Sequence, residues 1–380
     1  MIFDYETLKL IWWLLIGALL IGFALTDGFD MGAGVLNPFL GHNDDERRVV
    51  INSVGPHWDG NQVWFITAGG AIFAAWPLVY AAAFSGFYVA LLLVLFALIL
   101  RPVGFEYRSK LPSERWRWFW DWALFAGSAV PALVFGVAFG NLLQGVPFHY
   151  DAELAPHYTG SFFALLNPFA LLAGVLSLAL LVLHGATYLQ LRTEGVLRER
   201  AERAARLAAA TVIVAFAAAG LWLAWGIEGY RILSMPAPDA SFVPPAKTAE
   251  RAAGAWLANY KTWPWMMAAP ILGFIGAIAA FLLSGARRAG LAFIASSIAI
   301  VGVILTAGFS MFPFVMPSSS NPASSLTVWD ATSSHKTLQL MFWAVVVFLP
   351  IVLAYTMWAY RVMRGKVTVD KIRAQSRSAY

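Results

Sequence analysis

Long apolar runs recur along the whole chain, and short polar segments separate them. A run of about 20 apolar residues is long enough to cross a bilayer as a helix. Pro and Gly inside some runs are compatible with this, because neighbouring helices satisfy the backbone groups that they free. The pattern predicts an all-α polytopic membrane protein with about nine transmembrane helices. The predicted spans cover residues 10–36, 50–74, 77–101, 118–143, 161–190, 207–227, 263–284, 289–312 and 337–361.

Composition supports the same class. Hydrophobic residues make up 60% of the chain and charged residues only 12%, about half the charged share of soluble proteins. This excludes a disordered chain and argues strongly against a soluble enzyme. The absence of cysteine excludes a disulfide, a thiolate metal site and a cysteine nucleophile. The first run follows acidic residues and has no small-residue cleavage site, so we expect a retained helix and no signal peptide.

The basic residues are distributed unevenly between the two sides of the membrane. An odd number of spans puts the termini on opposite sides, and 20 of the 26 Lys and Arg residues fall on the side of the C-terminus. Short cytoplasmic loops carry such an excess. We therefore expect a cytoplasmic C-terminus and a periplasmic N-terminus. The net charge of +5 is then a topology signal, and we expect no nucleic-acid partner.

Two pairs of spans share a weak internal repeat. Leu14-Leu-Ile-Gly17 and Asp27-Gly28 resemble Leu171-Leu-Ala-Gly174 and His184-Gly185, at a common offset of 157 residues. A second pair, Phe139…Pro147 and Phe309…Pro317, is also four spans apart, so paired helices run in the same direction. Chance similarity between Leu- and Gly-rich helices is the alternative explanation. The repeat predicts one integral membrane domain, 1–380, built from four-helix units at 1–150 and 151–320, followed by a ninth helix and cytoplasmic tail at 321–380.

Five ionisable residues lie within or at the ends of the first three spans: Asp27, Asp30, His57, Asp59 and Glu106. The helical rise of 1.5 Å per residue places all of them in the cytoplasmic half of the membrane. Such groups are costly in lipid and mark ion or proton pathways. We interpret them as a candidate proton pathway. The alternative is a buried network that only holds helices together.

Cofactor sites within the chain are weakly indicated. A haem between His57 and His184 would need both rings at one depth on facing helices, and we expect hydrogen-bonded histidines instead. The remaining histidines form no recognisable metal site, and we expect no metal and no catalytic residue in this chain. The Met- and Phe-rich stretch that begins at Met311 is either structural or lines a pocket for a lipid or quinone tail.

Several longer motifs resemble subunit II of cytochrome bd-type ubiquinol oxidases. The resemblance runs in order from the first predicted helix to the ninth and so covers essentially the whole chain. The matching stretches are GFALTDGFDMGAG at 22–34, INSVGPHWDGNQVW at 51–64, AAWP at 74–77, RPVGFEYRSK at 101–110, GNLLQGVP at 140–147, FPFVMPSS at 312–319 and WDATSS at 329–334.

The resemblance implies a subunit of an oxidoreductase complex in the bacterial inner (plasma) membrane. The complex oxidises quinol and reduces O2 to water, takes protons from the cytoplasm and generates a proton-motive force. Haem b and haem d belong to the larger partner, subunit I, and small single-span accessory subunits join the pair. This chain is then haem-free, stabilises subunit I and contributes to proton uptake. Some members hold a quinone as a structural ligand, so a ubiquinone bound in this chain is an open alternative.

The resemblance also assigns residues. It matches the family's acids of helices 1 and 2 to Asp30 and Asp59, with Asp27 and His57 beside them, and the acid at the end of helix 3 to Glu106. Two other hypotheses stay open. A proton-coupled secondary transporter would suit the repeat, the broken helices and the intramembrane acids, although the later spans have few matching polar groups. A purely structural assembly subunit would lose activity only together with the complex.

Overall fold

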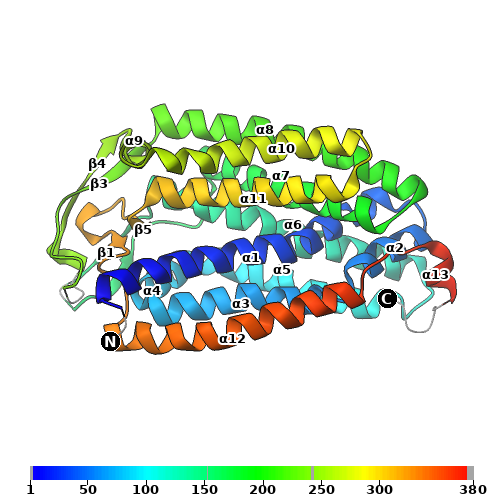
Figure 1. Ribbon diagram of the computed structural model, residues 1–380, viewed down its shortest axis with the longest axis horizontal. Helices are drawn as coiled ribbons and strands as arrows, with labels where there is room; N and C mark the ends of the chain where they lie inside the picture. The colour runs from blue at the N-terminus through cyan, green and yellow to red at the C-terminus, as the bar shows by residue number, and fades with distance from the viewer. Residues whose placement is uncertain (1–2, 152, 241–243, 375–380) are drawn as a thin grey trace.

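The computed structural model describes residues 3–151, 153–240 and 244–374. Long helices lie side by side along one axis (Figure 1). Within the described residues, eight helices are long and apolar enough to cross a membrane, and a bent pair raises the number to nine. The predicted all-α polytopic class is confirmed. The long helices are α1 (Tyr5–Leu40), α3 (Trp58–Ala75), α5 (Tyr88–Tyr107), α6 (Glu114–Gln144), α7 (Pro168–Arg192), α8 (Gly195–Gly226), α10 (Ala268–Gly285), α11 (Ala289–Met311) and α12 (His335–Val362).

Short elements close the two ends of the bundle. Three antiparallel strand pairs gather at one end, which we call the loop end, whereas α2 and α13 lie at the other, the α2 end (Figure 1). The strands are β1 (Phe148–Tyr150), β2 (Pro156–Tyr158), β3 (Glu228–Ser234), β4 (Thr248–Ala253), β5 (Phe314–Met316) and β6 (Leu326–Thr327), and the short helices are α2 (Asp44–Val54), α4 (Pro77–Gly86), α9 (Ala258–Thr262) and α13 (Val369–Ala374). Single 3-10 turns occupy Phe163–Leu166, Pro244–Ala246, Ala255–Leu257, Pro264–Met267 and Pro322–Ser324.

Two predicted spans have different boundaries in the structure. The span predicted at 50–74 is interrupted around Pro56: α2 ends at Val54 and α3 begins at Trp58. The span predicted at 77–101 is divided between α4 and α5, and α4 is bent by 119° from α3. Pro77 occupies the first turn of α4, where its missing N–H costs nothing. The helix α5 continues beyond the predicted end, and this places Arg101 inside a helix.

The helix α8 also begins earlier than predicted. The expected start was residue 207, whereas the helix begins at Gly195. The added segment is rich in Arg, Glu and Ala, which are strong helix formers, so the helix extends beyond its apolar part. Hydropathy alone cannot detect such an extension.

The helix α1 packs on α3, α6 and α7 and connects the early helices to the later ones. It meets α7 in direct backbone contact: a Cβ on Gly32 would lie 2.1 Å from the Leu181 carbonyl oxygen, and a Cβ on Gly185 would lie 2.4 Å from the Gly32 carbonyl carbon. Small residues allow this close approach between membrane helices. The division into two repeated four-helix units stays a prediction.

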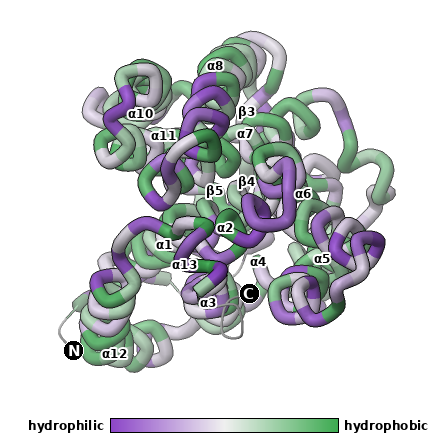
Figure 2. Tube along the Cα trace, turned by 90° about the vertical axis from the view of Figure 1, so that its right-hand side faces the viewer, coloured by the Kyte–Doolittle hydropathy of each residue, from purple (hydrophilic) through white to green (hydrophobic). Residues whose placement is uncertain are grey.

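The ninth helix, α12, lies on the outside of the bundle (Figure 2). Its most apolar stretch of 18 residues contains no buried residue. In the whole helix, only Leu338 is buried. Hydrophilic residues gather at the α2 end, which faces the viewer in Figure 2. The chain therefore presents an apolar side that it does not cover itself and a polar surface at one end.

Candidate functional site

A buried ion pair joins α1 to α5. Asp27 and Arg101 are both fully buried, and the Arg101 guanidinium donates hydrogen bonds of 2.6 and 2.8 Å to the two Asp27 carboxylate oxygens. A charged pair in the interior is stable only with such geometry. The sequence analysis identified Asp27 but not its partner, because it ended the third span at Arg101. A cation inside a span requires a partner, so a longer span would have revealed it.

One turn further along α1, Asp30 lies within a second buried network. Asn61 of α3 donates a 2.7 Å hydrogen bond to Asp30 Oδ2 and accepts one of 2.5 Å from the Tyr360 hydroxyl of α12. Asp30 Oδ1 has no hydrogen-bond partner but lies 3.6 Å from His57 Nδ1. The structure thus brings Asp30 and His57 together, with Asp27 on the same helix.

The positions of the protons around His57 follow from its contacts. His57 Nε2 lies 2.8 Å from the Tyr188 hydroxyl, which donates its proton to the Ser53 carbonyl oxygen at 3.1 Å. Since a tyrosine has one proton to donate, His57 Nε2 donates to the Tyr188 oxygen. The other ring nitrogen, His57 Nδ1, faces Asp30 Oδ1.

Asp59 and Glu106 lie outside this network. Both side chains are exposed, and neither forms a side-chain hydrogen bond or ion pair within the described ranges. Asp59 begins a face of α3 that continues through Val63, Ile66 and Phe73, which are 50%, 71% and 60% exposed. This spacing marks one side of a helix. The structure therefore separates the five predicted residues into a buried group of three and an exposed group of two.

His184 is buried with both ring nitrogens engaged. Nδ1 lies 2.8 Å from the Ser296 hydroxyl, and Nε2 lies 3.0 Å from the Leu25 carbonyl oxygen. A haem iron would have to displace one of these contacts. Across the described residues no group of three or more His, Cys, Asp or Glu side chains could hold a metal ion.

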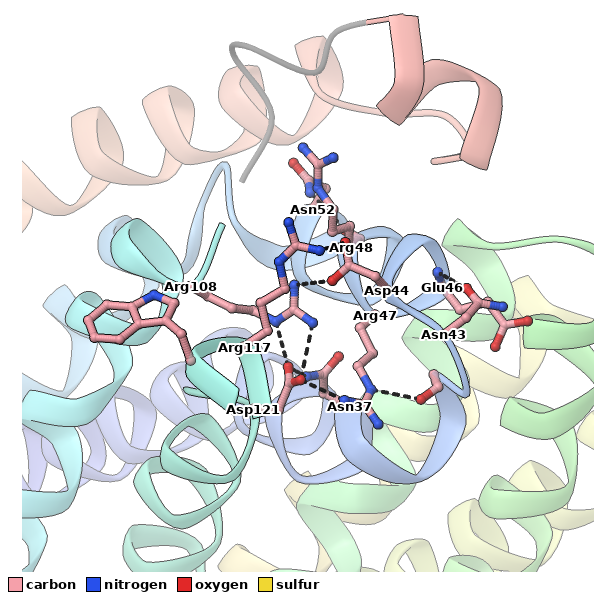
Figure 3. Close-up of polar contacts among 12 residues, drawn as sticks. Asn37, Asn43, Asp44, Glu46, Arg47, Arg48, Asn52, Arg108, Arg117 and Asp121 are labelled. Carbon is pink, nitrogen blue, oxygen red and sulfur yellow. Dashed lines mark hydrogen bonds and ion pairs between the residues drawn. The ribbon is translucent and has the colours of Figure 1, made fainter. Parts of the chain in front are cut away.

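A third charged cluster ties helices together at the α2 end (Figure 3). Asp121 of α6 accepts hydrogen bonds from Arg108 at 2.6 and 3.1 Å, from Arg47 at 2.8 Å and from Asn37 at 2.9 Å. Arg108 also donates to Asp44 of α2 at 3.0 Å. The sequence analysis missed this cluster, because its members are scattered over α1, α2, α6 and the position that follows α5, and only Asp121 lies within a predicted span.

The loop end contains a further buried ion pair. Lys247 Nζ lies 2.7 Å from Asp330 Oδ2 and donates to the Pro244 carbonyl oxygen at 2.8 Å. Burial lowers the pKa of Lys247, and the nearby Asp330 carboxylate partly opposes this shift. The pair joins two loops that are far apart in the sequence and fixes them over the bundle.

The fold and these networks define a multi-pass membrane protein with charged groups buried between its helices. A family model described as cytochrome bd terminal oxidase subunit II matches residues 8–363. The chain belongs to this family. It is thus a subunit of a respiratory electron-transport oxidase, and the secondary-transporter hypothesis is replaced.

Individual relatives agree with the family model. The chain is 56% identical to cytochrome bd-I ubiquinol oxidase subunit 2 of Escherichia coli K12 over 377 residues, covering 99% of this chain and 100% of the relative. It is 36% identical to cytochrome bd ubiquinol oxidase subunit 2 of Bacillus subtilis 168, covering 94% and 96%. A chain in the structure of the bd oxidase from Geobacillus thermodenitrificans shares the fold, with a TM-score of 0.68 and 16% identity, covering 94% of this chain and 98% of that one.

Proposed function

We propose that this chain is the haem-free subunit of a bd-type ubiquinol:O2 oxidoreductase and that it contributes to proton uptake from the cytoplasm. The observation that carries the proposal is the approach of His57 Nδ1 to Asp30 Oδ1, 3.6 Å apart between two buried side chains. A carboxylate and an imidazole at 3.6 Å are suited to accept and pass on a proton. His184 supports a haem-free chain, because both of its nitrogens already have partners.

The route would enter at the α2 end, which we infer to be cytoplasmic. The Arg residues of the Asp121 cluster and the hydrophilic residues that Figure 2 colours purple lie there, as expected for the cytoplasmic side. Asp59 lies two residues from both His57 and Asn61 and is exposed on α3. We infer that Asp59 passes protons towards the Asp30–His57 pair, which lies further along the route. Glu106, at the end of α5, would lie at the entrance.

Subunit I is the partner that would cover the exposed apolar side. An unpaired carboxylate on an apolar helix face is too costly to leave in lipid, and Asp59 occupies such a face on α3. The helix α12 lacks buried residues in its most apolar window. A large apolar partner would bury both surfaces, and single-span accessory subunits would occupy what remains. The haems b and d would lie in subunit I and supply the redox chemistry.

The test is Asp59→Asn in the purified complex. We expect quinol-driven O2 uptake per haem to fall about tenfold or more, because proton transfer by a positioned side chain contributes a large rate factor, while the reduced-minus-oxidised haem spectrum is retained. Asp239→Asn at the loop end, which changes an exposed carboxylate, is the matched control and should be silent. Unchanged O2 uptake in Asp59→Asn would contradict the proton role. Loss of activity only in parallel with loss of the complex would favour a purely structural subunit.

A ubiquinone tail has a suitable cavity in this chain. A space of about 260 Å³ lies between α1, α6, α7, α8 and α11 and is lined by apolar side chains, with hydroxyl groups only at Ser177, Thr306 and Ser310. It fits an isoprenoid chain and offers no charged contact for a headgroup. A Cβ on Gly220, which lines the cavity, would meet no atom within 4 Å. Gly220→Leu should therefore lower the quinone content of the complex, whereas Gly290→Leu, equally open but outside the cavity, should not.

A further inference from the structure

A second cavity, of about 520 Å³, lies at the α2 end between α1, α7, α11 and the segment that follows α12. Aromatic rings form much of its wall. Phe29 stacks on Tyr188 with ring centroids 4.1 Å apart. Phe293 and Tyr360 lie against the Phe29 ring, with centroids 6.0 and 6.3 Å away. This wall is suited to an apolar or amphipathic ligand.

The rim of the cavity is basic. Arg192, Arg364 and Lys366 line it, and no carboxylate does. The nearest acid in an ion pair is Glu194, whose carboxylate lies 3.8 Å from Lys366 Nζ while both side chains are about half exposed. Such a pair contributes little, so the rim carries positive charge that the described residues do not neutralise.

Arg192 is the buried member of the rim. Its side chain is 8% exposed, its Nη1 donates to the Gly365 carbonyl oxygen, and its guanidinium lies over the Tyr188 ring at 5.9 Å. Its Nε is buried without a hydrogen-bond partner. A buried cationic donor without an acceptor is unfavourable. Because Nε itself is closed to solvent, an anionic group in the cavity would meet the charge of the rest of the guanidinium.

We propose that this cavity binds one anionic phospholipid, with its phosphate at Arg192, Arg364 and Lys366. The helices α7 and α12 end at Arg192 and Val362, so the rim lies where these spans end and lipid headgroups begin. Basic pockets between membrane helices bind anionic headgroups. The acyl chains would follow the exposed apolar surface of α11, where Ile294 is 56% exposed. A soluble anion would leave the aromatic wall uncovered, which favours a lipid.

The experiment uses the purified complex, depleted of lipid in detergent and incubated with vesicles of phosphatidylcholine alone or mixed with phosphatidylglycerol. Native mass spectrometry counts the lipids retained. We expect one phosphatidylglycerol to be retained per copy of this chain, and its binding to weaken about 30-fold in Arg364→Gln/Lys366→Gln, since each basic residue near the surface contributes about 1 kcal/mol. Arg361→Gln/Lys371→Gln removes the same charge at the same end outside the cavity and should bind like the wild type.

Three results would overturn the inference: equal retention in both double variants, equal binding of phosphatidylcholine, or displacement of the lipid by inorganic phosphate. The last result would assign the rim to a soluble anion. Both variants change exposed side chains, so their thermal unfolding and haem absorbance should match the wild type. Lipid retention is measured without turnover and should be unchanged in Asp59→Asn, so this inference and the proton role can fail independently.

Discussion

Asp27 and Arg101 face one another in the interior with two hydrogen bonds of 2.6 and 2.8 Å, although 74 positions separate them in the sequence. Both are charged groups removed from water, and each is compensated only by the other and its immediate surroundings. The pair holds α5 against α1 beside the network that contains Asp30. It is therefore expected to position that network as well as to stabilise the fold.

Arg101→Leu should destabilise the subunit by about 3–5 kcal/mol, because it leaves the Asp27 carboxylate buried without its partner. The measurement is the thermal unfolding and yield of the complex. The double variant Asp27→Leu/Arg101→Leu should recover part of this loss, since no unpaired charge remains. If the loss in the double variant equals the sum of the losses in Asp27→Leu and Arg101→Leu alone, the two residues are not coupled.

Tyr188→Phe should remove the hydroxyl that links His57 to the Ser53 carbonyl. Two buried polar groups then lose a partner, and we expect a cost of about 1–3 kcal/mol in thermal stability. Turnover per haem should fall because the His57 ring is no longer held toward Asp30. Tyr107→Phe changes a tyrosine that is 54% exposed and serves as the control. Normal turnover in the Tyr188→Phe complex would show that the proposed proton route does not depend on the orientation of the His57 ring.

Asp121→Ala should release the connections between α1, α2 and α6 at the α2 end. Arg108, which is 1% exposed, would lose its main counter-ion, so we expect a loss of about 3–5 kcal/mol. Thermal unfolding of the complex measures it. Asp370→Ala at the same end removes an exposed carboxylate and should stay within about 0.5 kcal/mol. Similar effects of both substitutions would contradict a specific role for the cluster.

The loop end should show a pH dependence that originates from Lys247. Burial lowers its pKa below the ordinary value of 10.5, so between the folded-state pKa and 10.5 the unfolded chain binds more protons than the folded chain. Stability then rises with pH across this window. Thermal unfolding of the wild type relative to Lys247→Met should therefore improve as the pH rises toward 10.5. A difference that is flat or declines with pH would contradict this sign.

Much of the fold follows from hydropathy, because lipid forces each spanning segment to be a long apolar helix. The same reasoning fails where a helix leaves the membrane or breaks within it. The start of α8 depends on helix propensity in a charged segment, and the break between α2 and α3 depends on Pro56. Neither effect changes the number of apolar residues in a segment, which is the quantity that hydropathy measures.

The candidate site was predicted as a set of residues but not as a set of contacts. Depth along a helix selected Asp27, Asp30 and His57, which the structure buries close to one another. It could not distinguish them from Asp59 and Glu106, because depth does not specify which face of a helix a residue occupies. Tyr188 and Tyr360 were missed for a related reason: their hydroxyl groups reach the site from α7 and α12, and nothing local in the sequence marks such long-range contacts.

The bare surface of α12 also has a consequence for biogenesis. A newly inserted copy of this chain that has not met its partner leaves that helix in contact with lipid alone, and leaves the Asp59 carboxylate on an open apolar face. Such an orphan is recognisable to membrane proteases and chaperones by the same features that the partner would conceal. We therefore expect the amount of this subunit in the membrane to fall when its partner is absent.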